Sequence, residues 1–409
     1  MNCRHCKKEL TSTFLDLGTS PPSNAYLSKD DLKKEESYFP LKVMVCSNCW
    51  LVQTLDYTNA EELFSKDYAY FSSTSSSFLA HAKEYSKNII SNLSLDEESF
   101  VAEIASNDGY LLKNFIESNI PCIGIEPTDS TADAAEKLGI PVIRKFFGEK
   151  IAINLSDSGK KADLIIGNNV YAHVPDINDF TKGLSILLKP EGTITLEFPH
   201  LMKLLEFNQF DTIYHEHFSY LSLHSVTSIF NMAGLRIYNI EELPTHGGSI
   251  RVYGCHANAN INEDKSVKNM LEHEYNFGIT DMKIYDSFQN IAEQVKESFI
   301  KFLDNALASN KVVAGYGAAA KGNTLMNFAA IKDNSIAFVC DAAPAKQNKF
   351  LPGAHIQILH PDQLISNEVD YIIIFPWNIA SEVKQQLRDK LKYKAKFVTF
   401  IPDLSIEDL

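Results

Sequence analysis

The chain has 409 residues, of which 45% are hydrophobic and 22% are charged, and its formal net charge is −14 at pH 7. This length predicts two or three domains, and the apolar content is sufficient for a normal core in each of them. The acidic balance argues against nucleic acid as the main partner, because a phosphate backbone requires a basic surface. No apolar run approaches membrane-spanning length and the N-terminus has no secretory signal pattern, so we expect a cytoplasmic protein without a membrane partner.

Four of the seven cysteines form two pairs near the N-terminus, and two residues separate the cysteines within each pair. One turn can then present both sulfurs of a pair to the same ion, and two such turns complete a tetrahedral zinc site. An odd total of cysteines with this clustering favours a metal in a reducing compartment over disulfides. Four thiolates leave zinc no open position, so the metal should be structural, and His5 is expected to be a bystander. The predicted ligands are Cys3, Cys6, Cys46 and Cys49.

A stretch dense in tyrosine and serine, residues 67–78, leads into a helical pattern at residues 79–85. Small polar residues in such a run usually form a loop or begin a helix, so the stretch can be a simple linker. Closely spaced aromatic hydroxyls can equally line a polar pocket, and composition does not decide between the two. The candidates for a site are Tyr68, Tyr70, Phe71 and Ser72.

The most informative motif is a nucleotide-type turn between two strand signals. Residues 99–102 predict a strand, residues 111–116 a helix, and residues 122–125 a second strand that ends in Glu126, which could bind ribose hydroxyls. Ala105 and Asn107 replace the first two glycines of a dinucleotide turn, and only Gly109 remains. A pyrophosphate needs those glycines, whereas a nucleoside without phosphate does not, so the pattern favours S-adenosylmethionine (SAM) over NAD. An ordinary βαβ unit without a ligand is the alternative. The cofactor residues expected here are Glu103, Ala105, Asn107, Gly109, Tyr110, Glu126 and Pro127.

Three further strand signals, at residues 142–146, 162–167 and 193–198, alternate with helical segments and predict a mostly parallel sheet. The second of these strands runs into Asn168 and Asn169, and His173 follows. Polar residues at the carboxyl end of such a strand face the ligand crevice. We therefore expect the two asparagines to contact the cofactor and His173 to face the acceptor, with a core or capping histidine as the alternative.

The chemistry is expected in residues 211–220, which place two histidines, a carboxylate and two tyrosines close together. The spacing of His215 and His217 differs from the four-residue spacing of helical metalloprotease histidines. On an extended segment these two histidines would share one face, and Glu216 would point to the other. An imidazole with a pKa near neutrality can abstract a proton, so an acid–base role fits at least as well as a metal site. A hydrogen-bonded structural cluster is the third possibility. Tyr214 and Tyr220 complete the candidate set.

The remaining motifs suggest contacts to a polar substrate. His246 and Arg251 flank a Gly-Gly turn, and the last 100 residues or so repeat the strand-turn-helix pattern of a nucleotide site. That second turn retains Gly315 and Gly317, and Lys321 at the start of the following helix suits a diphosphate. The glycines could also serve packing alone. The substrate residues expected in this part of the chain are Gly317, Lys321 and Asn323.

Over essentially its whole length the chain resembles the SAM-dependent sugar C-methyltransferases that act on nucleotide-linked 4-keto-6-deoxy sugars. The motifs that carry the resemblance are the paired cysteines, the turn at residues 103–109, residues 214–220, residues 245–251 and the turn at residues 315–323. The resemblance implies a structural zinc and a dTDP-4-keto sugar that is methylated at carbon 3. It implies His217 as the general base, with Glu216, Tyr214 and His173 beside it, and either Tyr68 or Tyr70 as an active-site tyrosine.

The expected fold is α/β, with an N-terminal zinc-binding module (residues 1–66), a central doubly wound SAM-binding domain (67–240), a connecting and substrate-contacting segment (241–300) and a smaller C-terminal Rossmann-like domain (301–409). We expect a monomer or a weak dimer. Alternatives to the C-methyltransferase are a sugar O-methyltransferase, a methyltransferase for another small polar acceptor, and a zinc-ribbon protein that binds RNA and uses SAM only as a ligand. The acidic composition argues against the last of these.

Overall fold

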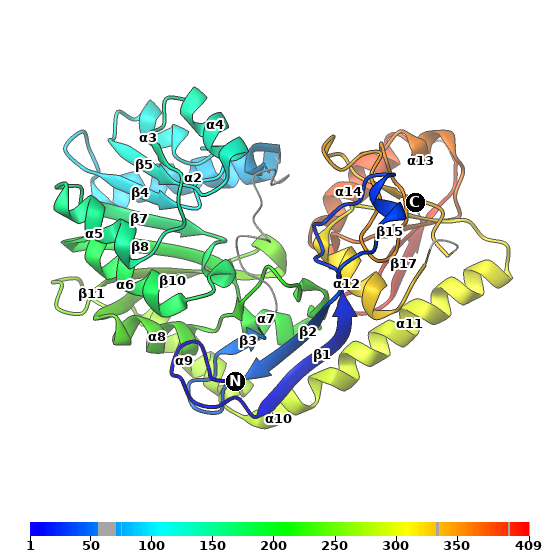
Figure 1. Cartoon of the computed structure of the whole chain (residues 1–409), viewed down its shortest axis with the longest axis horizontal. Helices are drawn as coiled ribbons and strands as arrows, with labels where there is room; N and C mark the ends of the chain where they lie inside the picture. The colour runs from blue at the N-terminus through cyan, green and yellow to red at the C-terminus, as the bar shows by residue number, and fades with distance from the viewer. Residues whose placement is uncertain (56–70, 75, 333–334, 392, 409) are drawn as a thin grey trace.

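The computed structural model describes residues 1–55, 71–74, 76–332, 335–391 and 393–408. These residues form three sheets, one for each part expected from the sequence (Figure 1). In Figure 1 the central unit lies on the left, the C-terminal unit on the right, and the N-terminal sheet below and between them. Tyr68 and Tyr70 lie outside the described residues.

The N-terminal sheet is antiparallel and has the strand order β1-β2-β3-β9. Its last strand comes from far along the chain, because Tyr220 and Ser219 pair with Val52 and Gln53. The zinc module therefore shares a sheet with the segment that follows the histidine-rich motif. The elements are β1 (Ser12–Ser20), η1 (Asp31–Lys33), β2 (Phe39–Val45), β3 (Val52–Thr54) and β9 (Ser219–Tyr220).

The central sheet has seven strands in the order β10-β11-β8-β7-β4-β5-β6, and β11 runs antiparallel to both of its neighbours. The strands from β8 to β6 are parallel, so their carboxyl ends meet at one edge. Both β4 and β5 are buried along their length, as expected for parallel strands that helices cover on both faces. The strands are β4 (Val101–Ile104), β5 (Cys122–Ile125), β6 (Val142–Ile143), β7 (Ala162–Asn168), β8 (Leu188–Pro199), β10 (Leu235–Leu243) and β11 (Ser249–His256).

Helices pack on both faces of the central sheet (Figure 1). The α-helices are α2 (Ser76–Leu93), α3 (Lys113–Glu117), α4 (Asp129–Lys137), α5 (Glu149–Asp157), α6 (Ile177–Leu187), α7 (Leu201–Glu206) and α8 (Leu223–Met232). The short 3-10 turns are η2 (Ser72–Thr74), η3 (Tyr171–His173), η4 (Phe210–Thr212) and η5 (Thr245–Gly247).

The C-terminal sheet has the order β14-β13-β12-β15-β16-β17, in which only the final pairing, β16 with β17, is antiparallel among the described residues. This arrangement confirms the smaller Rossmann-like unit. Its strands are β12 (Val313–Tyr316), β13 (Val339–Cys340), β14 (Ile358–Leu359), β15 (Tyr371–Ile374), β16 (Lys396–Thr399) and β17 (Ser405–Asp408). Its helices are α12 (Ala320–Phe328), α13 (Gln363–Ser366), η6 (Trp377–Ile379) and α14 (Ala380–Arg388).

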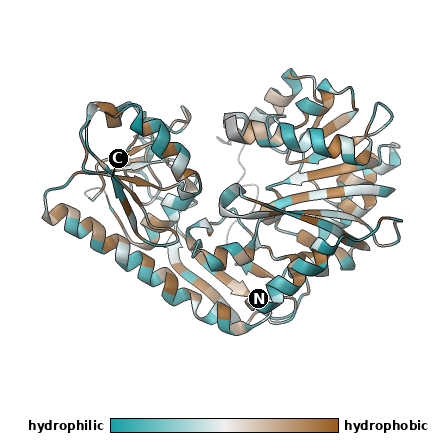
Figure 2. Cartoon of the chain, turned by 180° about the vertical axis from the view of Figure 1, so that it is seen from behind, coloured by the Kyte–Doolittle hydropathy of each residue, from teal (hydrophilic) through white to brown (hydrophobic). Residues whose placement is uncertain are grey.

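Three helices, α9 (Lys265–Phe277), α10 (Met282–Asp286) and α11 (Phe288–Ala308), connect the central and C-terminal units. The long helix α11 presents an apolar stripe at helical spacing, visible as brown bands in Figure 2. At one end of the stripe Phe288 stacks on Phe14 of β1, with ring centroids 4.9 Å apart. Further along the helix, Phe299 packs edge-on against Phe400 at 4.8 Å. The helix thus ties the C-terminal unit to the N-terminal sheet.

The α/β class and the expected sequence of three units are confirmed. One feature of the fold was not anticipated: β11 lies inside the segment expected to be a connection, yet it is buried between β8 and β10. Within the described part of the chain, no helix combines the length and apolar character needed to cross a bilayer.

Candidate active site

The four N-terminal cysteines converge on one point. The sulfurs of Cys3 and Cys49 are 3.6 Å apart, those of Cys6 and Cys46 are 3.5 Å apart, and all four lie within 4.8 Å of one another. Thiolates that surround zinc tetrahedrally at about 2.3 Å lie roughly 3.8 Å from each other. The spacing therefore fits a closed zinc site, and none of these cysteines forms a disulfide.

The neighbours of the cysteines join this site to the rest of the protein. The two ring nitrogens of His5 lie 2.9 Å from Asn178 Oδ1 and 3.1 Å from Ser228 Oγ, so His5 is engaged away from the sulfurs. The amide of Gln53 in β3 donates to the sulfur of Cys3. Next to it, the hydroxyl of Thr54 donates to the carbonyl of His217 at 3.0 Å. The zinc module thus supports the backbone of the expected general base.

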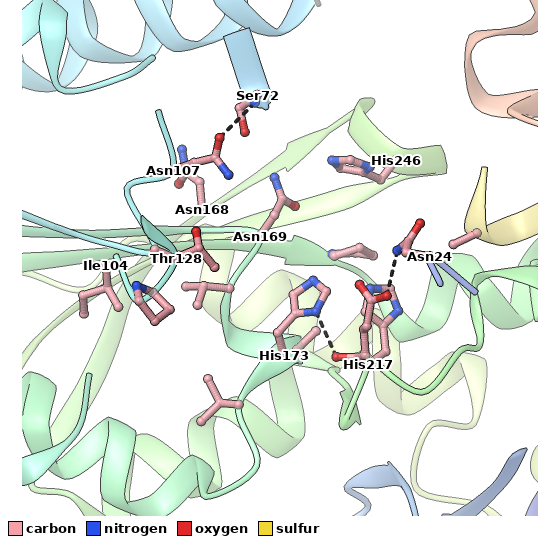
Figure 3. Close-up of a pocket in the computed structure, with 18 of the residues that line it drawn as sticks. Asn24, Ser72, Ile104, Asn107, Thr128, Asn168, Asn169, His173, His217 and His246 are labelled. Carbon is pink, nitrogen blue, oxygen red and sulfur yellow. Dashed lines mark hydrogen bonds between the residues drawn. The ribbon is translucent and has the colours of Figure 1, made fainter. Parts of the chain in front are cut away.

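A cavity of about 860 Å³ lies where the three units meet. Its walls come from the carboxyl edge of the central sheet, from the histidine-rich segment and from Asn24 of the N-terminal module (Figure 3). Lys321 and Asn378 of the C-terminal unit complete them. The volume is at the upper end of the range for small-ligand sites, which suits two ligands side by side.

Three residues of the nucleotide-type turn have left-handed backbone angles. Ala105 and Asn107 both have positive φ angles, 56° and 49°, and Gly109 has φ of 78°. A side chain at Gly109 would collide with Ile140, whose Cδ1 would be 2.5 Å from an added Cβ. The left-handed residues are therefore retained although two of the glycines are not. A left-handed alanine is uncommon, and such strained residues concentrate at functional sites.

The cavity wall near this turn contains buried polar groups without hydrogen-bond partners among the described residues. The side-chain oxygen of Asn168 and both polar side-chain atoms of Asn169 are buried and have no hydrogen-bond partner among the described residues. Buried polar atoms are nearly always satisfied, so these atoms indicate a polar ligand. Glu126 lies beside them, and its carboxylate accepts hydrogen bonds from the backbone N–H groups of Asn107 and Thr128, both at 3.0 Å. The set fits the ribose, amine and carboxylate groups of SAM.

The histidine-rich segment is a turn rather than an extended strand, because the N–H of His217 donates to the carbonyl of Tyr214. Tyr214, Glu216 and His217 consequently all line the cavity. His215 points away: its Nε2 donates to the carbonyl of Pro40, and its ring packs against Phe39. The expectation that the two histidines share a face and Glu216 opposes them is therefore wrong.

Two histidines in the cavity are held in defined tautomers. Nδ1 of His217 donates to the carbonyl of Thr212 at 2.9 Å, and Nδ1 of His173 donates to the carbonyl of Glu216 at 2.9 Å. Since a carbonyl can only accept, the lone pair of each neutral imidazole is on Nε2. Burial lowers the pKa of His217 well below its usual range, and burial lowers the pKa of His173 to about 4. Both rings are neutral near pH 7, and their centroids are 4.7 Å apart. The expectation of an imidazole pKa near neutrality is therefore wrong for these two histidines.

Comparisons with known proteins agree with this geometry. Residues 3–64 match a zinc binding domain model, residues 78–240 a methyltransferase domain model, and residues 244–402 the C-methyltransferase C-terminal domain model. The chain is 32% identical over 401 residues to the C-methyltransferase NovU of Streptomyces niveus. The match covers 98% of this chain and 95% of NovU.

The chain belongs to the C-methyltransferase family. Solved structures are similar over parts of the chain only. One is a possible histamine N-methyltransferase from Thermotoga maritima, with 18% identity, 38% of this chain and 81% of that chain covered, and a TM-score of 0.32. Another is the magnesium protoporphyrin IX methyltransferase of Synechocystis PCC 6803 with bound SAM, with 13% identity, 44% and 81% covered, and a TM-score of 0.33. The family assignment rests on the sequence relationship.

The protein is thus a SAM-dependent C-methyltransferase with a zinc-binding module. In this C-methyltransferase some of the residues expected to bind the cofactor or the acceptor line the cavity, and others do not. The described ones that line the cavity are Ser72, Ala105, Asn107, Tyr110, Glu126, Pro127, Asn168, Asn169, His173, Tyr214, Glu216, His217, His246 and Lys321. Those that do not line it are Glu103, Gly109, Phe71, Tyr220, Arg251, Gly317 and Asn323.

Two of the residues that do not line the cavity, Arg251 and Gly317, have contacts elsewhere. Arg251 forms ion pairs with Glu197 and Glu241, each at 2.8 Å. An added Cβ on Gly317 would be 2.4 Å from Cδ of Pro376, so this glycine permits close packing. Oε2 of Glu103 and the hydroxyl of Tyr220, by contrast, are buried without a hydrogen-bond partner among the described residues.

A buried ion network holds one cavity residue, His246. Glu197, which is fully buried, accepts hydrogen bonds from His81, Arg251 and the hydroxyl of Thr245. Burial alone would raise the pKa of Glu197, but the bonds from His81 and Arg251 lower it to about 2. His246, which follows Thr245 in the chain, has a left-handed backbone with φ of 54°. Its Nε2 has no hydrogen-bond partner among the described residues. The network fixes an uncommon conformation at the cavity wall.

Several wall residues were not found from the sequence. Asn378 follows the carboxyl end of β15, where the position on a parallel strand was an available signal. The aromatic pair Phe146 and Phe147 follows β6 in the same way. Asn24 had no local signal, because it reaches the site only through contacts with residues far along the chain.

Replacement of Glu126 by glutamine should weaken SAM binding by about tenfold or more. The neutral amide loses charge-assisted hydrogen bonds to the ribose hydroxyls, worth roughly 1.5–3 kcal/mol. Titration calorimetry with SAM measures the effect, and thermal unfolding without SAM controls for damage to the turn that Glu126 caps. Unchanged affinity in a folded variant would place the ribose elsewhere.

Proposed function

We propose that this C-methyltransferase removes the proton from carbon 3 of a dTDP-linked 4-keto-6-deoxy sugar and methylates the resulting enolate, which yields a branched sugar nucleotide. The observation that carries the proposal is the neutral His217, whose Nε2 lone pair belongs to a ring that lines the cavity. The class of acceptor follows from the family resemblance. SAM, when bound, supplies an electrophilic methyl group and leaves as S-adenosylhomocysteine.

His217 is suited to be the base. The proton on carbon 3 is acidic because the neighbouring ketone can take the negative charge as an enolate, so a neutral imidazole suffices to abstract it. Nε2 accepts the proton, and the Nδ1 hydrogen bond to Thr212 fixes the ring while the imidazolium forms. The proton passes to water after methyl transfer. The carbanion supplies the nucleophile, so this step needs no metal ligand from the protein.

The enolate oxygen requires a hydrogen-bond donor, and the tautomers limit the choice. Neutral His173 carries its proton on Nδ1, where Glu216 accepts it, so its Nε2 offers a lone pair and no proton. We therefore assign the donor role to the hydroxyl of Tyr214, whose ring lies 4.0 Å from that of His217 and which lines the same cavity.

The diphosphate is assigned to the C-terminal wall. Lys321 lies at the beginning of α12, where the helix dipole also favours an anion, and Lys346 lines the same wall. The Lys321 ammonium donates to Asn378 at 2.7 Å and lies 4.0 Å above the Trp377 ring. Gly317 and Asn323 support this wall from behind.

The direct test is incubation with a panel of dTDP-4-keto-6-deoxy sugars and SAM, read by mass. A gain of one methyl group is expected, and that methyl group should be bonded to carbon. Without SAM, the enzyme should exchange deuterium from solvent into carbon 3, because exchange needs only enolisation. Methylation of an oxygen would contradict the mechanism. So would an enzyme that methylates carbon 3 when SAM is present but exchanges no deuterium at carbon 3 when SAM is absent.

The pH dependence of kcat/KM for the sugar nucleotide should report Lys321. Burial lowers the pKa of Lys321 to about 8, so the ammonium is present at pH 7 and is lost as pH rises through 8. The diphosphate binds the ammonium form, and kcat/KM should therefore fall above pH 8, towards about tenfold per pH unit. Lys321→Arg keeps its charge and should remove this limb. A limb that persists in the arginine variant would belong to another group.

A further inference from the structure

A residue of the N-terminal module reaches into the active site. Nδ2 of Asn24 donates to Oε1 of Glu216 at 2.7 Å, and the Asn24 side chain itself lines the cavity (Figure 3). The two residues are 192 positions apart in the chain. Such a short hydrogen bond to a carboxylate is a charge-assisted one, stronger than a bond between neutral groups.

The loop that carries Asn24 is fixed to the C-terminal unit. The side-chain amide of the buried Asn323 donates to the carbonyl of Ser23 at 2.5 Å. The hydroxyl of Tyr26 donates to the carbonyl of Ala318 at 2.6 Å and lies 3.1 Å from Oδ1 of Asn24. Backbone hydrogen bonds between Leu27 and Phe350 hold the end of the loop. Asn24 therefore connects the turn beside the expected diphosphate wall to a carboxylate next to His217.

We propose that Asn24 is a positioning residue for methyl transfer: its amide holds the Glu216 carboxylate in the orientation that the deprotonation step requires. This inference rests on the proposed function. Glu216 lines the cavity beside His217 and is assigned a hydroxyl of the sugar, since the Nδ1 hydrogen of His217 is already donated to Thr212. The amide acts through the carboxylate, and the bond from the Tyr26 hydroxyl to the Ala318 carbonyl holds the loop that carries the amide. Asn323, expected from the sequence to touch substrate, acts here by holding the loop.

A double-mutant cycle tests the assignment. Asn24→Ala should lower kcat and the rate of solvent deuterium exchange at carbon 3 by about tenfold each, the order of one charge-assisted hydrogen bond, while KM for SAM stays unchanged. In a Glu216→Ala background the same change should have no further effect on kcat, because the carboxylate that Asn24 acts on is gone. Asn24→Asp, which keeps the size but places a second carboxylate beside Glu216, should be at least as slow as Asn24→Ala. Ala25→Ser on the exposed neighbouring position should match the wild type.

The same cycle is also measured on the free energy of unfolding. If Asn24 and Glu216 are in contact, the destabilisations of the two single variants should not add up in the double variant, whichever sugar the enzyme methylates. Wild-type failure on the whole sugar panel would reject the proposed function without touching this unfolding result. Two outcomes would overturn the positioning role: additive unfolding energies, or kinetic effects of Asn24→Ala and Glu216→Ala that multiply. The latter would make Asn24 a separate contact of its own.

Discussion

Replacement of His217 by asparagine is expected to reduce turnover by about 10²–10⁴, the usual contribution of a general base. Asparagine can still donate to the carbonyl of Thr212, which His217 Nδ1 does at 2.9 Å, so the turn should be retained. It lacks the Nε2 lone pair that accepts the proton. Solvent deuterium exchange at carbon 3 should vanish as well, whereas SAM affinity should stay at the wild-type value.

The turn at residues 214–217 supplies a matched control. His215 is two positions away and equally buried, but its ring donates to Pro40 outside the cavity, so His215→Asn should leave kcat within a fewfold of wild type. Glu216→Gln should fall between the two histidine variants if the carboxylate orients a group rather than reacting. A His217 variant that exchanges deuterium at the native rate would clear this residue, and Tyr214 would then be tested as the base.

The burial of His217 should also affect the acid limb of the pH–rate profile. Burial lowers the pKa of His217 well below its usual range, so the imidazole stays neutral, and able to accept a proton, at pH values where an exposed histidine is half protonated. Lowering the pH from 7.5 to 6 should therefore leave kcat nearly constant. A fall of about fourfold or more across this range, measured with saturating substrates, would show that the base titrates near 6.5 or above.

Much of the fold could be predicted from the sequence because it depends on local patterns. The apolar runs at residues 122–125 and 162–167 are long enough, and regular enough, to predict the parallel strands β5 and β7. The turn after β4 was expected as well, and the structure adds that Ala105 and Asn107 have left-handed angles there. The paired cysteines needed only their spacing.

The active site was predictable in composition but not in detail, and the reason is physical. Which way His215 and Glu216 point depends on one backbone hydrogen bond, from His217 to Tyr214, which neither periodicity nor residue type reveals. Asn24 contributes through a contact that spans 192 positions, and β9 joins the N-terminal sheet from a similar distance. Contacts of this kind form only when separate units pack together, so local sequence signals do not carry them.

Removal of zinc, by chelation or by Cys46→Ser, should disable the active site as well as lower the unfolding temperature. The Cys3 sulfur accepts a hydrogen bond from Gln53 in β3, which pairs with β9, and Thr54 beside it donates to the carbonyl of His217. Structural zinc contributes on the order of 10 kcal/mol of apparent binding energy to small zinc domains, so its loss should release β3 from β9. Turnover should then fall in proportion to zinc content. Hydrogen exchange should rise in the peptides covering residues 52–54 and 217–220, while the C-terminal strand β12 keeps its protection. Zinc-free protein with native exchange at β9 and native turnover would show that the metal stabilises only its own module.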